Sequence, residues 1–375
     1  MATLPQKVKL LRGLLTGETA YSGPFYVTID VTRRCNLRCL GCRYHSPFLK
    51  TAIPDHPPTQ DISLPIVEKL CKELKQMDTH TMILQGAGEP VLHPDFPELV
   101  AVVKKAGFHT TLLTNGTLLG ADLIQTFIDW KFDVVKVTLW AISPEEYEQN
   151  YPGTDPDNFK KVIEGMKRMA ELKAEQKSTA PSVILHFPIN RNNYQGIDAL
   201  GNLALTTGCH ELSFAPMNDE GGALDSFALS PDEERSARQT LSRLRKRLNS
   251  LSLNHNIDQT LLRYEMGRAV WKKMPCYVPW FHARITQEGA VRPCGRCSLC
   301  FGNLQDKTFH EIWNGSAIRA FRSKAIRSNK VPLLREQSDC SFCCLAGDNA
   351  QVHRFFKRFL PFLNHPNKEL SCPEG

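Results

Sequence analysis

The sequence has no long apolar run and no recognisable export signal. None of its apolar stretches approaches the roughly 20 residues that an α-helix needs to span a bilayer. Residues 1–20 lack the apolar core of a signal peptide, because Lys7, Lys9 and Arg12 interrupt them. These absences predict a cytoplasmic protein, and 375 residues suffice for one large domain and a smaller one.

Strong charge of either sign is also missing. The formal net charge is only +7, and the sequence has neither a long basic run nor a basic sheet motif interleaved with aromatic residues. We therefore expect no nucleic-acid partner. Internal repeats and low-complexity tracts are absent as well, so nothing in the composition argues against ordinary globular domains.

Cysteine is scarce in the middle of the chain and abundant towards its two ends. Of the 13 cysteines, three lie near residue 40 and eight lie after residue 275, whereas only Cys71 and Cys209 lie between. In a reducing compartment, clustered cysteines indicate thiolate metal ligands rather than disulfides. Cys71 and Cys209 stand in apolar contexts, which predicts that both are packed core thiols.

Six short β-rich runs recur between residues 25 and 217, and a helical pattern follows each of them. The runs are nearly continuous apolar stretches, which is typical of parallel strands buried on both faces. They read FYVTIDVT, TMILQGAG, HTTLLTNG, VVKVTLWA, SVILHFPI and ELSFAPM. Six β-then-α units predict an α/β fold, a partial (β/α)6 barrel whose chemistry lies at the C-terminal ends of its parallel strands.

Helix-start signals and changes in composition divide the chain further. Ser143 with Glu146, and Ser230 with Glu233, have the spacing of a capping box, and a proline follows each serine. The region after Met274 is rich in cysteine and turns. The predicted parts are an N-terminal segment (1–24), the barrel (25–225), a helical linker (226–273), a small Cys-rich α+β domain (274–350) and a basic aromatic tail (351–375).

The stretch VTRRCNLRCLGCRYH places Cys35, Cys39 and Cys42 on one loop after the first strand. Thiolates are the usual ligands of iron–sulfur clusters and of structural zinc. No fourth Cys or His completes a zinc site at this spacing, although a zinc loop and a chance grouping remain alternatives. Three thiolates would hold three irons of a 4Fe-4S cluster and leave the fourth iron open, and the four nearby arginines would offset the negative charge.

This Cys-x3-Cys-x2-Cys loop resembles the signature of the radical S-adenosylmethionine (SAM) superfamily. The resemblance implies that the amino and carboxylate groups of SAM chelate the open iron, and that cleavage of SAM gives a 5′-deoxyadenosyl radical. The family usually has an aromatic or bulky residue before the third cysteine, where it helps to hold the adenine. This chain has Gly41 at that position, and Tyr44 is the candidate substitute.

Three further motifs resemble the cofactor-binding elements of this family. Gly88 and Glu89 belong to AGEP, which resembles the Gly-Gly-Glu-Pro motif whose carboxylate suits the SAM ammonium group. Thr114 and Asn115 resemble the element that contacts the ribose and carboxylate, and Thr138 stands where the family often has a serine near the cofactor. An ordinary turn is the alternative for the first two motifs. Weaker candidates for cofactor or substrate contacts lie near the end of the fifth strand: His186, Asn190, Arg191 and Asn193.

The C-terminal cysteines resemble the twitch or SPASM extension of radical SAM enzymes, which binds auxiliary iron–sulfur clusters. Twelve residues separate Cys276 from Gly289, four separate Gly289 from Cys294, and a GNL…IWN…R stretch follows. The match to the shorter, twitch form implies at least one auxiliary 4Fe-4S cluster held by Cys276, Cys294, Cys340 and Cys343. Four cysteines stay unassigned, as ligands of a second cluster or a zinc ion or as free thiols: Cys297, Cys300, Cys344 and Cys372. A zinc ribbon is the alternative for the whole region.

Together these motifs predict a radical SAM enzyme that abstracts hydrogen from a small biosynthetic metabolite, such as a sugar or alcohol, with the auxiliary cluster in electron transfer. One alternative is ribosomal-peptide maturation, against which the short segment before the first strand counts mildly; another is a non-catalytic iron–sulfur or zinc protein. The expected partners are a small-molecule or peptide substrate and a reductant such as flavodoxin or ferredoxin. The tail VHRFFKRFLPFLNHP suits weak contact with a membrane surface, but docking onto the protein itself is the stronger expectation.

Overall fold

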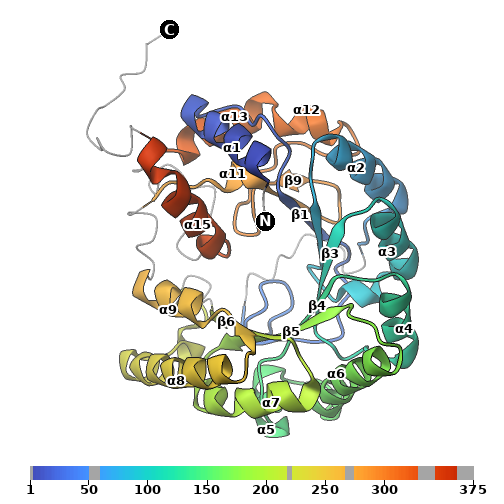
Figure 1. Cartoon of the computed structure of the whole chain (residues 1–375), viewed down its shortest axis with the longest axis vertical. Helices are drawn as coiled ribbons and strands as arrows, with labels where there is room; N and C mark the ends of the chain where they lie inside the picture. Colours follow the sequence, from blue (N-terminus) through green and yellow to red (C-terminus); the bar gives the residue numbers. More distant parts are fainter. Residues whose placement is uncertain (1–2, 50–59, 218–221, 267–273, 328–342, 361–375) are drawn as a thin grey trace.

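A curved sheet forms the centre of the molecule, and most of the helices lie outside it (Figure 1). The computed structural model describes residues 3–49, 60–217, 222–266, 274–327 and 343–360. The six predicted strands are present, and neighbours among them are parallel. They are β1 (Tyr26–Asp30), β2 (Thr81–Gln85), β3 (His109–Thr114), β4 (Val134–Thr138), β5 (Ser182–Ile189) and β6 (Glu211–Pro216). The predicted partial barrel of parallel strands is therefore confirmed.

Helices follow these strands and cover the outer face of the sheet. They are α2 (Leu64–Gln76), α3 (Phe96–Lys105), α4 (Ala121–Asp129), α5 (Pro144–Asn150), α6 (Asn158–Glu175), α7 (Leu200–Thr207) and α8 (Pro231–Ser250). Ser230 and Glu233 form the complete capping box predicted for α8. At α5 only half of the motif forms, because the Glu146 carboxylate accepts a hydrogen bond from the Ile142 amide instead of the Ser143 amide.

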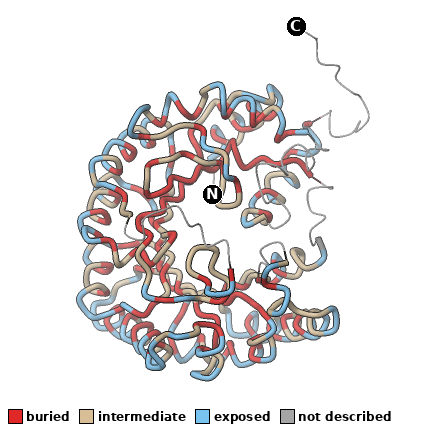
Figure 2. The backbone as a smooth tube through the Cα atoms, turned by 180° about the vertical axis from the view of Figure 1, so that it is seen from behind, coloured by how far each residue is buried: buried red, intermediate tan, exposed pale blue. Residues whose placement is uncertain are grey.

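The sheet has two faces of different character. In β4, Val135 and Val137 are fully buried, whereas the alternate residues Lys136 and Thr138 are only partly buried. Because successive strand residues point to opposite faces, the valines face the helices and the polar residues face the inside of the barrel. Figure 2 shows the same division along the chain, with buried segments on the strands and exposed turns on the outer helices.

The sheet extends beyond the six predicted strands. The strand order is β7-β6-β5-β4-β3-β2-β1-β8-β9. The strand β7 (Asn254–His255) lies within the predicted linker and pairs with β6, ahead of α9 (Ile257–Met266). The strand β8 (His282–Ile285) pairs in parallel with β1, and β9 (Val291–Arg292) pairs with β8 in antiparallel fashion. The Cys-rich region therefore begins as a continuation of the barrel sheet, and the domain limits given above remain predictions.

The remaining described α-helices lie towards the β8–β9 end of the sheet (Figure 1), and α15 also contacts α9 near its other end. They are α1 (Leu4–Thr16), α11 (Val278–Phe281), α12 (Phe309–Trp313), α13 (Ser316–Ala325) and α15 (Ala346–Phe356). The described part of the basic tail docks onto the protein, because Phe356 is buried and the Tyr277 hydroxyl bonds to His353 over 2.8 Å. The rest of the tail lies outside the described residues. Among the described helices, none has both the length and the apolar character required to cross a membrane.

Candidate functional site

The loop that carries the three N-terminal cysteines is fixed against two neighbouring segments. Arg34 forms an ion pair with Asp61 at 2.9 Å, and its carbonyl accepts a hydrogen bond from the Glu89 amide at 2.7 Å. Gly88 lies so close to this loop that a Cβ atom there would stand 2.1 Å from the Arg34 carbonyl oxygen. A larger residue at position 88 would displace this loop. The AGEP motif therefore packs directly against the cysteine loop.

Cys35, Cys39 and Cys42 lie together on this loop, each half-buried. The Cys42 amide donates to the Cys39 carbonyl at 3.0 Å, and burial together with the neighbouring Cys42 and Cys35 raises the pKa of the Cys39 thiol well above its usual value. Burial raises the pKa of Cys35 to about 12, so coordinated iron would be required to hold the thiolate form. His45 is no fourth ligand here, since its Nε2 bonds to the Ala87 carbonyl at 2.7 Å.

The donor set fits a 4Fe-4S cluster better than a single metal ion. Among the described residues, no three Cys, His, Asp or Glu side chains converge closely enough to hold one ion. Three thiols on one loop, with no fourth ligand beside them in the part of the chain that the structure describes, suit a larger cluster with one open position. Two of the nearby arginines have defined contacts. The guanidinium carbon of Arg33 lies 5.8 Å from the Tyr44 ring centre, and Arg34 pairs with Asp61.

Glu89 lies at the centre of a hydrogen-bond network between strand ends. Its side chain is 2% exposed, and its Oε1 accepts from the Thr114 hydroxyl at 2.7 Å. Its Oε2 accepts from the Asn115 amide at 2.7 Å, and the Val91 amide makes a longer bond of 3.4 Å to Oε1. Burial raises the pKa of Glu89 to about 7, although these bonds act in the opposite direction. A carboxylate has about four acceptor positions, so one remains for an ammonium group.

The structure gives a direct reason for Gly41. A Cβ atom at this position would lie 2.4 Å from Cη2 of Trp140, which follows β4. Trp140 is itself held by its backbone, whose carbonyl accepts from Asn150 and Asn193 at 3.0 and 2.9 Å. Any side chain at position 41 would thus collide with Trp140. The hydroxyl of the candidate substitute, Tyr44, accepts a hydrogen bond from Arg284 of β8 at 3.0 Å.

The polar candidates on β4 and β5 divide into two groups. Thr138 and His186 pair in register and are partly exposed on the inner face, and His186 Nδ1 bonds to Ser213 at 3.2 Å. Asn190 and Asn193 are buried and hold neighbouring segments through Asn150 and Trp140. Arg191 pairs with Glu233 of α8. Structural contacts thus account for Asn190, Asn193 and Arg191. The sequence analysis did not identify Trp140 as part of the site.

The C-terminal cysteines converge only in part within the described residues. The Cys294 and Cys344 thiols hydrogen-bond to each other, and Cys343 interacts electrostatically with Cys294. Cys276 is buried, and its amide bonds to the Ala325 carbonyl at 2.9 Å. The predicted ligand Cys340 and the unassigned Cys372 lie outside the described residues. Cys297 is buried, whereas Cys300 is exposed and bonds to the Gly302 carbonyl.

Gly289 explains part of the spacing between these cysteines. Its φ is +83°, which favours glycine, and a Cβ atom there would lie 2.9 Å from Oδ1 of Asn303. The Asn303 side chain in turn donates to the Glu288 carbonyl at 3.0 Å. The glycine of the Cys-x12-Gly-x4-Cys pattern and the asparagine of GNL therefore close the β8–β9 turn that leads to Cys294.

Residues 29–195 match the model of the Radical SAM superfamily. This chain belongs to that superfamily. Residues 276–344 match the model of an iron–sulfur cluster-binding domain, SPASM, which covers the C-terminal cysteines up to Cys344. The protein is therefore a radical SAM enzyme whose cofactors are SAM and 4Fe-4S clusters, as the cysteine loop predicted.

Known relatives of this radical SAM enzyme match both parts of the chain. The tungsten-containing aldehyde ferredoxin oxidoreductase cofactor-modifying protein of Pyrococcus furiosus is 22% identical over 328 residues, covering 79% of this chain and 83% of the relative. A PqqA peptide cyclase of Xanthomonas campestris is 24% identical over 310 residues, covering 80% and 77%. The crystal structure of Streptococcus suis SuiB bound to precursor peptide SuiA shares the fold, with a TM-score of 0.63 at 16% identity, covering 85% and 70%.

Proposed function

We propose that this radical SAM enzyme modifies a peptide. The observation that carries the proposal is that the similarity to a peptide cyclase extends over 80% of the chain, through the barrel and the Cys-rich region alike. A relative named as a cofactor-modifying protein covers a similar share of the chain. The small metabolite predicted from the single auxiliary cluster has less support than its alternative, ribosomal-peptide maturation.

The residues of the barrel rim would hold the cofactor. Cys35, Cys39 and Cys42 would bind the cluster, and Glu89 would accept the ammonium group of SAM while keeping Thr114 in place. When bound, cluster and SAM supply the 5′-deoxyadenosyl radical that removes a hydrogen atom from the substrate. Thr138 faces the inside of the barrel from the end of β4, where its hydroxyl would orient the cofactor.

The inside of the barrel offers polar groups to a peptide. Lys136, His186 and Glu211 lie on the inner face of β4, β5 and β6 and are partly exposed. Lys136 makes no ion pair within 4 Å to any described residue, and its charge is attracted by Glu211. The strand order ends at β7 and β9, which do not pair with each other among the described residues.

The cellular compartment and the route of electrons are also proposals. We expect the enzyme to work in the cytoplasm, where thiols stay reduced and a flavodoxin or ferredoxin is available to deliver electrons. The auxiliary cluster would then accept an electron from the substrate or pass one on. Neither role requires a membrane, and contact of the tail with a membrane surface has no support in the described residues.

A deuterium-transfer experiment tests the substrate class. Small-molecule and peptide fractions are prepared from source cells grown in deuterated medium and incubated with reconstituted enzyme, unlabelled SAM and a strong reductant. Hydrogen abstraction moves deuterium into 5′-deoxyadenosine, which mass spectrometry detects. We expect transfer from the peptide fraction and its loss after protease treatment. Transfer from the small-molecule fraction alone would contradict a peptide substrate, and S-adenosylhomocysteine as the only product would contradict radical cleavage.

A further inference from the structure

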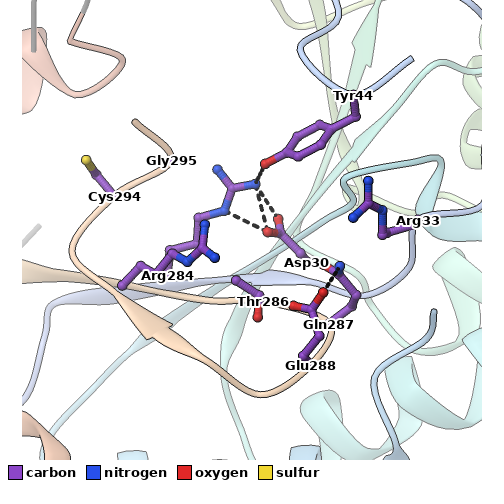
Figure 3. Close-up of a pocket in the computed structure, with 10 residues that line it drawn as sticks. Asp30, Arg33, Tyr44, Arg284, Thr286, Gln287, Glu288, Cys294 and Gly295 are labelled. Carbon is purple, nitrogen blue, oxygen red and sulfur yellow. Dashed lines mark hydrogen bonds and ion pairs between the residues drawn. The ribbon is translucent and has the colours of Figure 1, made fainter. Parts of the chain in front are cut away.

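A buried ion pair lies between the two regions that carry the predicted cluster ligands. Arg284 of β8 donates from Nε to Oδ2 of Asp30 at 2.7 Å and from Nη2 to Oδ1 at 2.9 Å. The side chains are 10% and 2% exposed. Figure 3 shows the guanidinium between Asp30 on one side and the Cys294–Gly295 turn on the other.

One side of this pair is tied to the first cysteine loop. Asp30 is the last residue of β1, five positions before Cys35. The Tyr44 hydroxyl, two positions after Cys42, accepts from Nη2 of Arg284 at 3.0 Å. Arg284 is therefore held by residues that flank the loop at both of its ends.

The other side of the pair is tied to the second cysteine region. A Cβ atom on Gly295 would lie 2.2 Å from Nη1 of Arg284, so the guanidinium packs directly against the residue that follows Cys294. Arg43, from the first loop, donates to the Gly295 carbonyl at 3.1 Å. The charge of Arg284 also acts on the Cys344 thiol, which contacts Cys294.

Charges in this position affect a nearby cluster through simple electrostatics. A 4Fe-4S cluster with four thiolates becomes more negative when it is reduced, so a fixed cation beside it favours the reduced form and a fixed anion disfavours it. Because Arg284 and Asp30 are buried, salt screens their fields only weakly. The two charges partly cancel, so either charge alone would change the reduction potential of the cluster more than the pair does.

We propose that Arg284 and Asp30 together set the reduction potential of the auxiliary cluster, with Arg284 raising it and Asp30 lowering it, and that Arg284 is a positioning residue that joins the two cluster loops. The role is independent of whether the substrate is a peptide, because it concerns electron transfer by the cluster and not recognition of the substrate.

A redox titration of the full-length reconstituted enzyme, followed by electron paramagnetic resonance, tests this role. The signal that does not change on adding SAM reports the auxiliary cluster. Arg284→Gln should lower its midpoint potential, Asp30→Asn should raise it, and the double variant should return close to the wild-type value. Arg319→Gln removes the same charge at an exposed position of α13 and should leave the potential unchanged.

General loosening of the fold cannot shift the midpoint potentials of the two single variants in opposite directions. The signs of the two shifts therefore test the role of the charges. Shifts in the same direction, or no shift in either single variant, would overturn the proposal. If Arg284→Gln fails to bind the auxiliary cluster, Asp30→Asn decides alone: an upward shift supports the proposal, and an unchanged or lower potential contradicts it. Arg284→Lys keeps the charge and should stay nearer to wild type than Arg284→Gln.

Discussion

At the scale of single residues, the proposed cofactor contacts are buried polar groups at the strand ends. Glu89 is the clearest example, because one carboxylate joins the turn after β2 to the turn after β3. Its burial makes ionisation costly, and its hydrogen bonds from Thr114 and Asn115 recover part of that cost. The ionised form is the one that suits an ammonium group.

We therefore expect SAM affinity to depend on pH through Glu89. Since the pKa of Glu89 is about 7 before SAM binds, protonation should weaken binding as the pH falls, by about tenfold at one unit below that value. Glu89→Gln should weaken binding about ten- to a hundredfold, the worth of roughly 1.5–3 kcal/mol for a charge-assisted bond, and should remove the pH dependence. Equilibrium dialysis with labelled SAM between about pH 6 and 7.5 measures both effects, and a Gln variant that keeps the wild-type pH profile would rule out the ammonium contact.

The pairing of Gly41 with Trp140 gives a second prediction. Gly41→Ala should destabilise the fold by about 1–3 kcal/mol, because the new methyl group would lie 2.4 Å from the Trp140 ring. Gly347→Ala adds the same methyl group where the nearest atom is 3.9 Å away, and should be neutral or slightly stabilising. Urea unfolding measures both. Adding Trp140→Phe, which removes the far ring atoms, should recover part of the loss; simply additive effects would show that the two residues do not compete for space.

At the scale of elements, α12 and α13 anchor the segment between α1 and β1. Trp313 donates from Nε1 to the Ser22 carbonyl at 2.8 Å, and Asn314 exchanges two hydrogen bonds with the Ala20 backbone. Arg322 is fully buried, and its guanidinium carbon lies 4.6 Å from the Trp313 ring centre. The IWN…R pattern noticed in the sequence thus connects the Cys-rich region to the beginning of the chain.

Arg322→Ala should cost about 3 kcal/mol of unfolding free energy. It would leave the Pro279 carbonyl and the Asn314 side chain without the hydrogen bonds that Arg322 donates at 2.9 Å. Arg319→Ala, one turn away on α13, loses only an exposed ion pair with Glu18 and should cost less than about 1 kcal/mol. Comparable losses in the two variants, measured by urea unfolding, would mean that burial of Arg322 contributes little.

The elements also mark the limit of sequence reasoning. The six strands were predictable, because each carries its own apolar run and a following helix signal. The short strand β8 was not, since its pairing with β1 joins residues more than 250 positions apart and has no local signature. Asp30 and Arg284 were missed for the same reason, although a charged residue in an otherwise apolar strand is a signal that could have drawn attention to both. Cys344 was left unassigned because the spacing favoured Cys343, whereas contact with Cys294 depends on the fold.

At the scale of the whole molecule, we expect two groups of cysteines from opposite ends of the chain to serve separate clusters. Replacing Cys35, Cys39 and Cys42 together with Ala should abolish formation of 5′-deoxyadenosine and leave about four irons bound at the auxiliary site. The electron paramagnetic resonance signal that remains should not respond to SAM, since a cluster with four protein thiolates has no open iron.

The iron count of this triple variant separates the alternatives that the sequence left open. About eight irons would bring the four unassigned cysteines into a second auxiliary site: Cys297, Cys300, Cys344 and Cys372. Absence of iron with zinc in its place would favour a zinc ribbon for the C-terminal region. A signal that shifts with SAM would mean that the auxiliary ligands are assigned wrongly. Cys209→Ala, at a buried thiol of the core, serves as the control and should change neither the iron nor the zinc content.

The pairing of β8 with β1 has a consequence for how the protein is made. When β1 leaves the ribosome, the strand that will cover its second edge is still roughly 250 residues from being synthesised. At about 5–20 residues per second, that edge stays open for roughly 13–50 seconds in each nascent chain. An uncovered strand edge invites pairing with other chains. That edge of the growing polypeptide is therefore open to such pairing for longer than it would be in a barrel closed by strands that are neighbours in the sequence.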